Sequence, residues 1–262
     1  MKISVITVVR NAQTTIADAI EAVAAQTYSD VEHIIIDGAS TDNTLEIIQR
    51  YKEQGLVVVS EPDKGLYDAM NKGIALATGD VIGLLNADDV FQDDSVLHQV
   101  AEVHADMDLD ACYADLVYVD ADDLNKVARD WRSRKFRSGL CFTGWMPAHP
   151  TFYVKKRVYE TVGLYNIDLG FQADLEFCAR AFEIHKISSR YIPMLWVRMR
   201  LGGVTNNRVG DIIKGNLQSY KALKTLGLTR DPFSFFALKL GPKLPQFMPK
   251  FLQNSFRYYP RP

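Results

Sequence analysis

Two adjacent carboxylates, Asp88 and Asp89, follow the apolar residues 81–85, where a buried strand is expected to end. Burying an unpaired carboxylate is costly, so a loop that happens to be polar does not account for Asp88. Mg²⁺ and Mn²⁺ prefer oxygen ligands and commonly bind one or two carboxylates together with phosphate oxygens. We therefore predict a divalent metal ion here, with a diphosphate whose negative charge it neutralises.

Acidic residues also end the neighbouring strands. Asp37 ends the second apolar run, within the sequence DGASTDNT, and Asp63 follows the third run. A turn into a helix accounts for Gly38 and for Thr41 or Asp42 as the helix cap, but it does not account for Asp37. A carboxylate at a strand end can accept a hydrogen bond from the N–H of a pyrimidine. We expect Asp37 to bind a base in this way and Asp63 to contact the base or its ribose.

The positions of these acids follow from a regular alternation of strand-like and helix-like hydrophobic patterns. Strands are expected at residues 3–9, 32–36, 56–59 and 81–85, and helical spacing recurs at 16–23, 45–48 and 67–77. Such alternation predicts an α/β fold in which helices cover both faces of a mostly parallel sheet. Ligands of these sheets bind outside the carboxyl ends of the strands, which is where the acids lie. Lys72, on the third helix, is a candidate phosphate contact, although helical lysines commonly point into solvent.

The later part of the chain has a different pattern. Strands are expected at 111–119 and 191–197, and helices at 155–162, from Asp174 onward, and at 209–226, with a basic segment at 129–137. We divide the chain into a domain at 1–205, made of a nucleotide-binding half (1–110) and an acceptor-binding half (111–205), and a C-terminal helical extension at 206–262.

Composition is that of a globular cytoplasmic protein. The net charge is only -2, but residues 1–197 carry 18 Lys and Arg against 30 Asp and Glu, whereas residues 198–262 carry 12 against 2. Three cysteines without metal-ligand spacing predict reduced thiols, and no stretch is long and apolar enough to span a bilayer. The basic, aromatic tail from residue 231 suits an anionic membrane surface, and packing on the domain or in a homodimer is the alternative.

Several segments, in order and spacing, resemble the family 2 glycosyltransferases of the GT-A fold. They are ISVITVVRNA, IIIDGASTDNT, SEPDKGLYDAMNKGIALATGDVIGLLNADD and HPTFYVKKRVYETVGLYN followed by ADLEFCAR, and they extend over roughly the first 205 residues. The resemblance implies a nucleotide-sugar donor, a UDP-sugar above others, and metal-assisted transfer with inversion. It assigns Thr7 and Val9 to the nucleotide pocket, Asp37 to the base, Asp63 to the nucleoside, Asp89 to the metal and Asp88 to the ribose or metal.

The resemblance places Asp174 at the position of the catalytic base. Inversion needs one carboxylate that takes the proton of the acceptor hydroxyl as it attacks, and a helix N-terminus keeps such a carboxylate ionised. A plain N-cap has the same geometry, so the sequence does not separate the two roles. Glu176 is the second candidate.

Three further residues are candidates for contact with the acceptor or the diphosphate: His149, Trp145 and Arg200. A lone His beside prolines is commonly a loop residue, and a Trp is commonly part of the core. Many relatives carry a His after the last core strand, where this chain has Arg200-Leu201-Gly202-Gly203. The QxxRW signature of processive synthases is also missing, which favours addition of a single sugar.

The sequence therefore predicts a hexosyl- or N-acetylhexosaminyltransferase of cell-surface glycan biosynthesis that uses Mn²⁺ or Mg²⁺. Its acceptor is expected to be a saccharide, free or lipid-linked, and its location the cytoplasm or the inner face of the membrane, with no nucleic acid partner. The alternatives are a sugar-1-phosphate nucleotidyltransferase or a non-catalytic member of the fold. The first would need a Gly-rich loop after the first strand, where this chain has RNAQTT.

Overall fold

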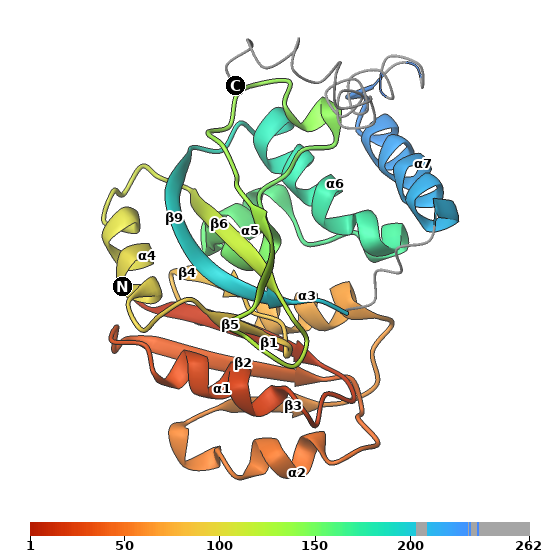
Figure 1. Ribbon diagram of the computed structural model, residues 1–262. Helices are drawn as coiled ribbons and strands as arrows, with labels where there is room; N and C mark the ends of the chain where they lie inside the picture. Colours follow the sequence, from red (N-terminus) through yellow and green to blue (C-terminus); the bar gives the residue numbers. More distant parts are fainter. Residues whose placement is uncertain (203–208, 230, 232–234, 236–262) are drawn as a thin grey trace, which may run out of the picture.

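The computed structural model describes residues 1–202, 209–229, 231 and 235, and the account below concerns these residues (Figure 1). The N-terminal half alternates strands and helices as the sequence patterns predict. Its elements are β1 (Ile3–Val9), α1 (Ile16–Ala24), β2 (Val31–Asp37), α2 (Thr44–Gln49), β3 (Val57–Ser60), α3 (Leu66–Leu76), β4 (Val81–Leu84), β5 (Asp89–Phe91) and α4 (Val96–His104).

The second half is more irregular. Its regular elements are β6 (Ala111–Val119), β7 (Val127–Trp131), β8 (Tyr153–Lys155), α5 (Lys156–Val162), α6 (Ala173–Ala179), β9 (Ser189–Arg200) and α7 (Val209–Thr225). Short turns of helix connect them, namely η1 (Lys52–Gln54), η2 (Cys141–Thr143), η3 (His149–Thr151), η4 (Ile167–Gln172) and the π-helical η5 (Arg180–Ile184).

All of the strands among the described residues join one curled sheet in the order β3-β2-β1-β4-β8-β6-β9-β5, with β7 paired to β6. The first four strands are parallel to one another, as predicted, and β6 is parallel to β9. Strands β5, β7 and β8 run antiparallel to their partners. The carboxyl ends of β1 to β4 therefore lie along one edge, and α3 begins at that edge because it follows β3.

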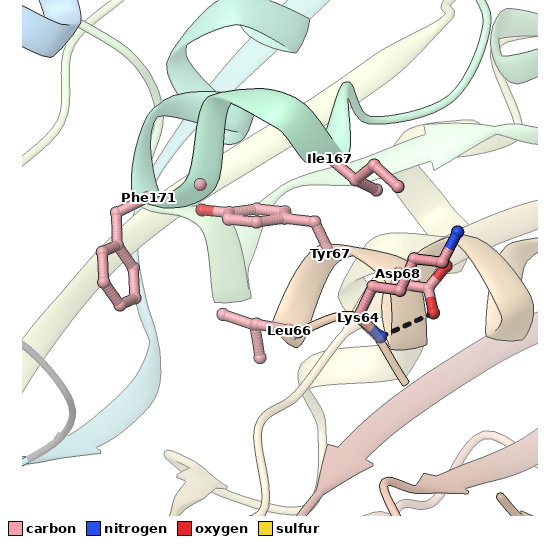
Figure 2. A pocket seen from close by; sticks show the side chains of 8 residues that line it. Lys64, Leu66, Tyr67, Asp68, Ile167 and Phe171 are labelled. Carbon is pink, nitrogen blue, oxygen red and sulfur yellow. Dashed lines mark hydrogen bonds between the residues drawn. The ribbon is translucent and has the colours of Figure 1, made fainter. Parts of the chain in front are cut away.

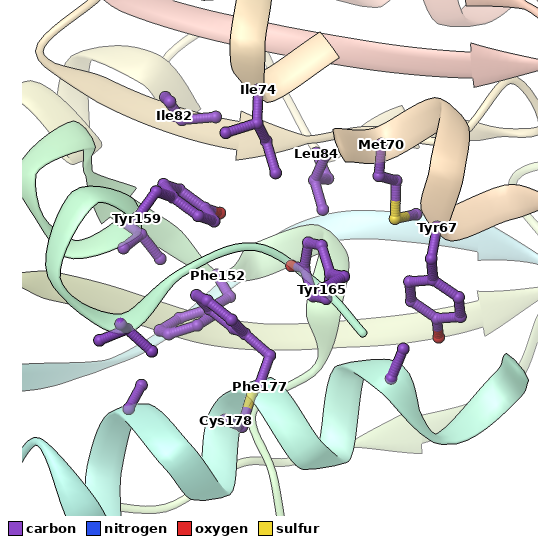
Figure 3. Close-up of a cluster of buried hydrophobic side chains, with 14 of the residues drawn as sticks. Tyr67, Met70, Ile74, Ile82, Leu84, Phe152, Tyr159, Tyr165, Phe177 and Cys178 are labelled. Atoms are coloured by element: carbon purple, nitrogen blue, oxygen red, sulfur yellow. The ribbon is translucent and has the colours of Figure 1, made fainter. Parts of the chain in front are cut away.

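Apolar residues on both faces of the sheet explain why its central strands are buried. The side chains of β1 are all buried, which is expected for a β-branched strand with helices on both sides. On one face Figure 3 shows Met70 and Ile74 of α3 directed toward Phe177 of α6, with Tyr159 and Tyr165 between them. On the other face Leu97 and Val100 of α4 and Trp196 of β9 pack with the first residues of β1.

A pair of hydrogen bonds joins α3 to the second half of the chain. The Asn71 side chain donates to the Tyr165 carbonyl at 2.9 Å and accepts from the Tyr165 amide at 3.0 Å. This double contact fixes the middle of α3 against the segment that leads into η4 and α6.

The C-terminal helix packs on the domain. Ala222 and Leu223 of α7 are fully buried, and the Ser219 hydroxyl donates to the Gln172 side chain at 2.6 Å. The predicted C-terminal helix is thus confirmed at α7, whereas most of the tail predicted to meet a membrane lies outside the described residues. Within the described part of the chain, no helix has the length and apolar character that crossing a membrane requires.

Candidate active site

Asp37 organises the turn after β2. Its buried carboxylate accepts hydrogen bonds from the Ser40 amide at 3.0 Å, from the Ser60 hydroxyl at 2.7 Å and from the Ser40 hydroxyl. These donors satisfy a charge that would otherwise be costly to bury. Asp37 therefore shapes the loop that faces the ligand edge of the sheet, and its predicted contact with a base remains a prediction.

Asp63 lies directly over Gly38. A Cβ atom built on Gly38 would be 2.2 Å from the Asp63 Oδ2 atom, so only glycine allows the two loops to approach this closely. The other Asp63 oxygen accepts from the Gly65 amide at 2.8 Å. The two acids that the sequence assigned to the nucleoside are therefore brought to neighbouring loops.

Gly38→Ala is expected to displace the Asp63 carboxylate and to lower the affinity for a nucleoside diphosphate by roughly tenfold, equivalent to about 1.4 kcal/mol. Stability should change little, because the group that must move is the end of a side chain. The measurement is calorimetric titration with UDP, together with the melting temperature. Gly215→Ala is the matched control, since its new Cβ would have no atom within 4 Å. Equal UDP affinity in wild type and Gly38→Ala would contradict this role for Gly38.

Two residues that the sequence patterns did not single out fix the rim of this region. Asn11 and Ala39 have left-handed backbones, with φ of 52° and 54°. The Asn11 side chain accepts from the Thr41 amide at 2.8 Å, and its own amide donates to the Ser40 hydroxyl at 2.8 Å. Left-handed conformations are costly for Ala, and such strain is concentrated at functional sites. Asn tolerates the left-handed conformation, so Asn11 was the sequence signal from which this turn could have been predicted.

Thr7 and Val9 lie beneath this rim. Thr7 is fully buried and its hydroxyl is 2.9 Å from His33 Nε2, whereas Val9 packs with Ile16, Ile20 and other apolar residues. Burial lowers the pKa of His33 to about 4, so the ring is neutral. The side chains of both residues are part of the core, and their assignment to a nucleotide pocket stays a prediction.

Lys72 is held by acids of the preceding loop. Its ammonium is 2.7 Å from Glu61, 3.6 Å from Asp68 and 2.9 Å from the Pro62 carbonyl. The hydrogen bond with Glu61 contributes most to a raised pKa. Lys72 therefore fastens residues 61–62 to α3, and it would have to leave these partners to contact a phosphate.

The acidic pair differs from the expected loop because Asp89 begins strand β5, which pairs with β9. Asp89 is 0% exposed, its Oδ2 accepts from the Asn86 side chain at 3.2 Å, and its Oδ1 has no hydrogen-bond partner. Asp88 is only partly buried. Burial first, and the Asp88 charge second, raise the pKa of Asp89 well above its usual value, and burial also raises that of Asp88.

Arg200 and His149 both lie near this acidic pair and contact the backbone or side chains of residues 86–88. Arg200 donates to the Asp88 carbonyl at 2.9 Å and to the Ala121 carbonyl at 3.2 Å, and it forms an ion pair with Asp18. His149 Nε2 is 3.0 Å from the Asn86 side-chain nitrogen that also contacts Asp89. Because burial lowers the pKa of His149 to about 4, the ring is neutral and Nε2 accepts from Asn86. A histidine thus lies beside the acids, although it comes from η3 and not from the segment after β9.

The donor set fits a hard divalent cation. Asp89 Oδ1 and Asn86 Oδ1 are buried oxygens without a hydrogen-bond partner, and burial makes the Asp88 and Asp89 carboxylates hard to ionise without a cation. Among the described residues, no three His, Cys, Asp or Glu residues form a complete metal cluster. The protein would thus supply one or two oxygens and a ligand the rest, which is the usual arrangement for Mg²⁺ with phosphates.

Trp145 does not stand free. Its ring lies 5.9 Å from Tyr113, 6.0 Å from Phe136 and 6.2 Å from Phe182, measured between ring centroids. These contacts make Trp145 part of an aromatic cluster, which is the packing role that the sequence offered as the alternative. Its predicted role at the acceptor remains untested.

Asp174 and Glu176 have different surroundings. Glu176 is buried and forms two hydrogen bonds of 2.9 Å with Arg180, so its charge is already paired. Asp174 accepts from the Leu175 amide at 2.7 Å, and the Tyr67 hydroxyl of α3 favours its ionised form. Burial raises the pKa of Asp174 to about 6. A carboxylate with a pKa near neutrality is suited to take a proton, which favours Asp174 over Glu176 as the base.

The fold and the site define the class of protein. The acidic pair Asp88 and Asp89 follows a parallel strand, and Asp174 lies at the start of α6. This fold is that of the GT-A glycosyltransferases. Staphylococcus aureus TarS in complex with UDP-GlcNAc superposes with a TM-score of 0.66 at 15% identity, over 98% of this chain and 73% of that one. The mannosyltransferase PcManGT of Pyrobaculum calidifontis, in complex with GDP-Man and Mn²⁺, gives 0.64 at 16% identity, over 92% and 68%.

The chain belongs to glycosyl transferase family 2, whose family model matches residues 4–162. A PGL/p-HBAD biosynthesis glycosyltransferase of Mycobacterium tuberculosis is 28% identical over 195 residues, covering 72% of this chain and 73% of the relative. An uncharacterized glycosyltransferase of the same species is 32% identical over 185 residues, covering 68% of each chain. The family and the GT-A fold expected from the sequence motifs are therefore confirmed.

Proposed function

We propose that this glycosyltransferase transfers one hexosyl or N-acetylhexosaminyl unit, with inversion, from a nucleotide sugar to a saccharide hydroxyl. The observation that carries the proposal is Asp174, a carboxylate whose pKa burial raises to about 6 and whose ionised form the Tyr67 hydroxyl of α3 favours. A UDP-sugar is favoured because Asp37 suits the N–H of a pyrimidine and because TarS, a protein of the same fold, binds UDP-GlcNAc. The acceptor belongs to cell-surface glycan synthesis and is free or lipid-linked.

The reaction follows from the residues of the site. The Asp174 carboxylate takes the proton of the acceptor hydroxyl while the acceptor oxygen forms a bond to the anomeric carbon of the donor. The bond from that carbon to the diphosphate oxygen breaks, and the electron pair leaves with the nucleoside diphosphate. Attack from the side opposite the diphosphate inverts the anomeric configuration.

A divalent cation, Mn²⁺ or Mg²⁺, supplies positive charge to the diphosphate when it is bound. Asp88 and Asp89 are the residues that would hold it. The sequence made Asp89 the direct ligand, but Asp89 is fully buried and Asp88 is partly open. We therefore propose the reverse order, with Asp88 toward the cation and Asp89 behind it. Arg200 and Asn86 hold the pair in place.

Calorimetric titration with UDP, GDP, dTDP and CDP, each with Mn²⁺ or Mg²⁺, tests the donor class. We expect UDP to bind most tightly, and EDTA to weaken its binding by at least about tenfold, because a cation held by Asp88 and Asp89 would neutralise charge on the diphosphate. Binding to none of the four would contradict a nucleotide-sugar donor. Tighter binding of GDP would leave the proposed transfer reaction standing, but it would make the donor a GDP-sugar and the bound nucleobase guanine.

A further inference from the structure

A small cavity opens between the first turn of α3 and η4, outside the acidic pair. Its volume is about 140 Å³, and Leu66, Tyr67, Ile167 and Phe171 contribute to its lining, together with Lys64 and Asp68 (Figure 2). The two elements are fixed relative to each other, because Asn71 of α3 holds the Tyr165 backbone just before η4.

The mouth of this cavity carries large apolar side chains that are open to solvent. Phe171 is 57% exposed, Leu66 40% and Ile167 36%. Scattered exposed apolar residues are ordinary, but three from two separate elements around one cavity form a patch of the kind that binds ligands. Gly170, with φ of 51°, breaks the helical turn just before Phe171 and so gives the Phe171 ring its outward position.

The cavity shares the Tyr67 side chain with the surroundings of the proposed base. The Tyr67 ring runs beneath η4 with its hydroxyl toward the Phe171 end (Figure 2), and this hydroxyl favours the ionised form of Asp174. Phe171 also precedes Asp174 by only three positions in the chain. A group bound in the cavity would therefore contact Tyr67 and lie one side chain away from Asp174.

The charges of the cavity select among occupants. The Asp68 carboxylate is already bonded to the Lys64 amide at 3.0 Å and lies 3.6 Å from the Lys72 ammonium. Among the residues that the structure describes, no ion pair within 4.0 Å joins the Lys64 ammonium to an acid. The free charge at the mouth is thus positive, and the remaining surface is apolar. An uncharged or anionic apolar group fits, and a cationic group does not.

We propose that this cavity is the acceptor subsite and that it binds an aryl or alkyl group next to the hydroxyl that receives the sugar. The physiological acceptor is then a glycoside with an apolar aglycone, and Leu66 and Phe171 determine specificity for it. This inference rests on the proposed function, because it takes Asp174 as the base. It adds the chemical class of the acceptor.

The test compares phenyl and methyl β-D-glucosides, and the matching galactosides, as acceptors with a UDP-sugar and Mn²⁺. The expected wild-type result is a higher kcat/KM for the phenyl glycoside. Leu66→Ala and Phe171→Ala should each lower the phenyl-to-methyl ratio by roughly tenfold, as the loss of apolar contacts in a specificity pocket commonly does. Leu76→Ala, at the other end of α3 and 43% exposed, is the matched control and should leave the ratio unchanged.

Two further measurements keep the outcomes distinct. Phe171→Leu retains apolar surface and should keep most of the phenyl preference, and UDP affinity and melting temperature should be unchanged in every variant. Equal kcat/KM for phenyl and methyl glycosides in the wild type, or an unchanged ratio in both Ala variants, would overturn the inference while transfer itself continues. If the wild type released no nucleoside diphosphate from any UDP-, GDP-, dTDP- or CDP-sugar, the proposed function would fail and this inference would fail with it.

Discussion

Asp174→Asn is expected to lower kcat by about two to four orders of magnitude, the usual range for the loss of a general base. Asn keeps the size of the side chain and can still contact Tyr67, but it cannot accept the proton of the acceptor hydroxyl. UDP affinity should remain within about twofold of wild type, because Asp174 faces the acceptor. The measurement is the rate of UDP release at saturating donor and acceptor. Turnover at the wild-type rate would remove Asp174 from the mechanism.

The same substitution should make the protein more stable above pH 6. Burial raises the pKa of Asp174 from 3.8 to about 6, so the folded state disfavours a charge that the unfolded chain carries freely. The cost is absent below pH 4, grows between pH 4 and 6, and is complete above that range. With each pKa unit equal to about 1.4 kcal/mol, Asn should gain on the order of 3 kcal/mol at pH 7.5. Melting temperatures of both proteins at pH 4 and pH 7.5 measure this gain, which should vanish at the lower pH.

The wild-type pH profile provides an independent check on Asp174. The base acts as the carboxylate, so kcat should rise with pH through a midpoint near 6 and then level off. Tyr67→Phe removes a hydroxyl that favours the ionised carboxylate, and it should move the midpoint upward.

Asp88→Asn is expected to have the second large effect, a loss of at least about tenfold in UDP affinity when Mn²⁺ is present. Asp88 is the more accessible acid of the pair, and Asn supplies a weaker, neutral oxygen to a cation. The calorimetric titration is repeated with Mn²⁺ and with EDTA. The affinities of wild type and variant should converge in EDTA, since the difference depends on the metal.

Asp89→Asn is the matched comparison for that result. It removes a buried carboxylate whose Oδ1 has no partner, so the variant should be more stable than wild type at neutral pH. Its loss of UDP affinity should be smaller than that of Asp88→Asn. If Asp89→Asn weakened binding more than Asp88→Asn did, Asp89 would be the direct ligand after all.

Local sequence patterns were sufficient for the first half of the fold. Strand β1 lies at the predicted residues, and β2, β3 and β4 differ from prediction by one or two residues at their ends. The reason is that β-branched runs and helical spacing alternate there without interruption. Strand β5 was missed because it has three residues and forms only by pairing with β9, which comes much later in the chain.

The site was predicted residue by residue, but its contacts were not. Position after a strand indicated Asp88 and Asp89, and the resemblance to family 2 indicated Asp174. The partners that affect their chemistry, such as Tyr67, come from distant segments. Lys72 is a further example. Its residue type suggested a phosphate contact, which stays a prediction, and the structure shows its ammonium paired with Glu61 and Asp68. Local sequence patterns contain no information about such pairings, because they form only when distant segments pack together.

The most direct test of the central claim is proton NMR of the product that wild-type protein forms from a UDP-sugar, Mn²⁺ and a phenyl glycoside. We expect one new glycosidic bond per acceptor, with the anomeric configuration opposite to that of the donor, and one UDP released for each bond. A product with the donor's configuration would contradict direct attack aided by Asp174. If the protein bound UDP but formed no glycoside with any acceptor, the account of this chain as a sugar-transferring enzyme would be contradicted.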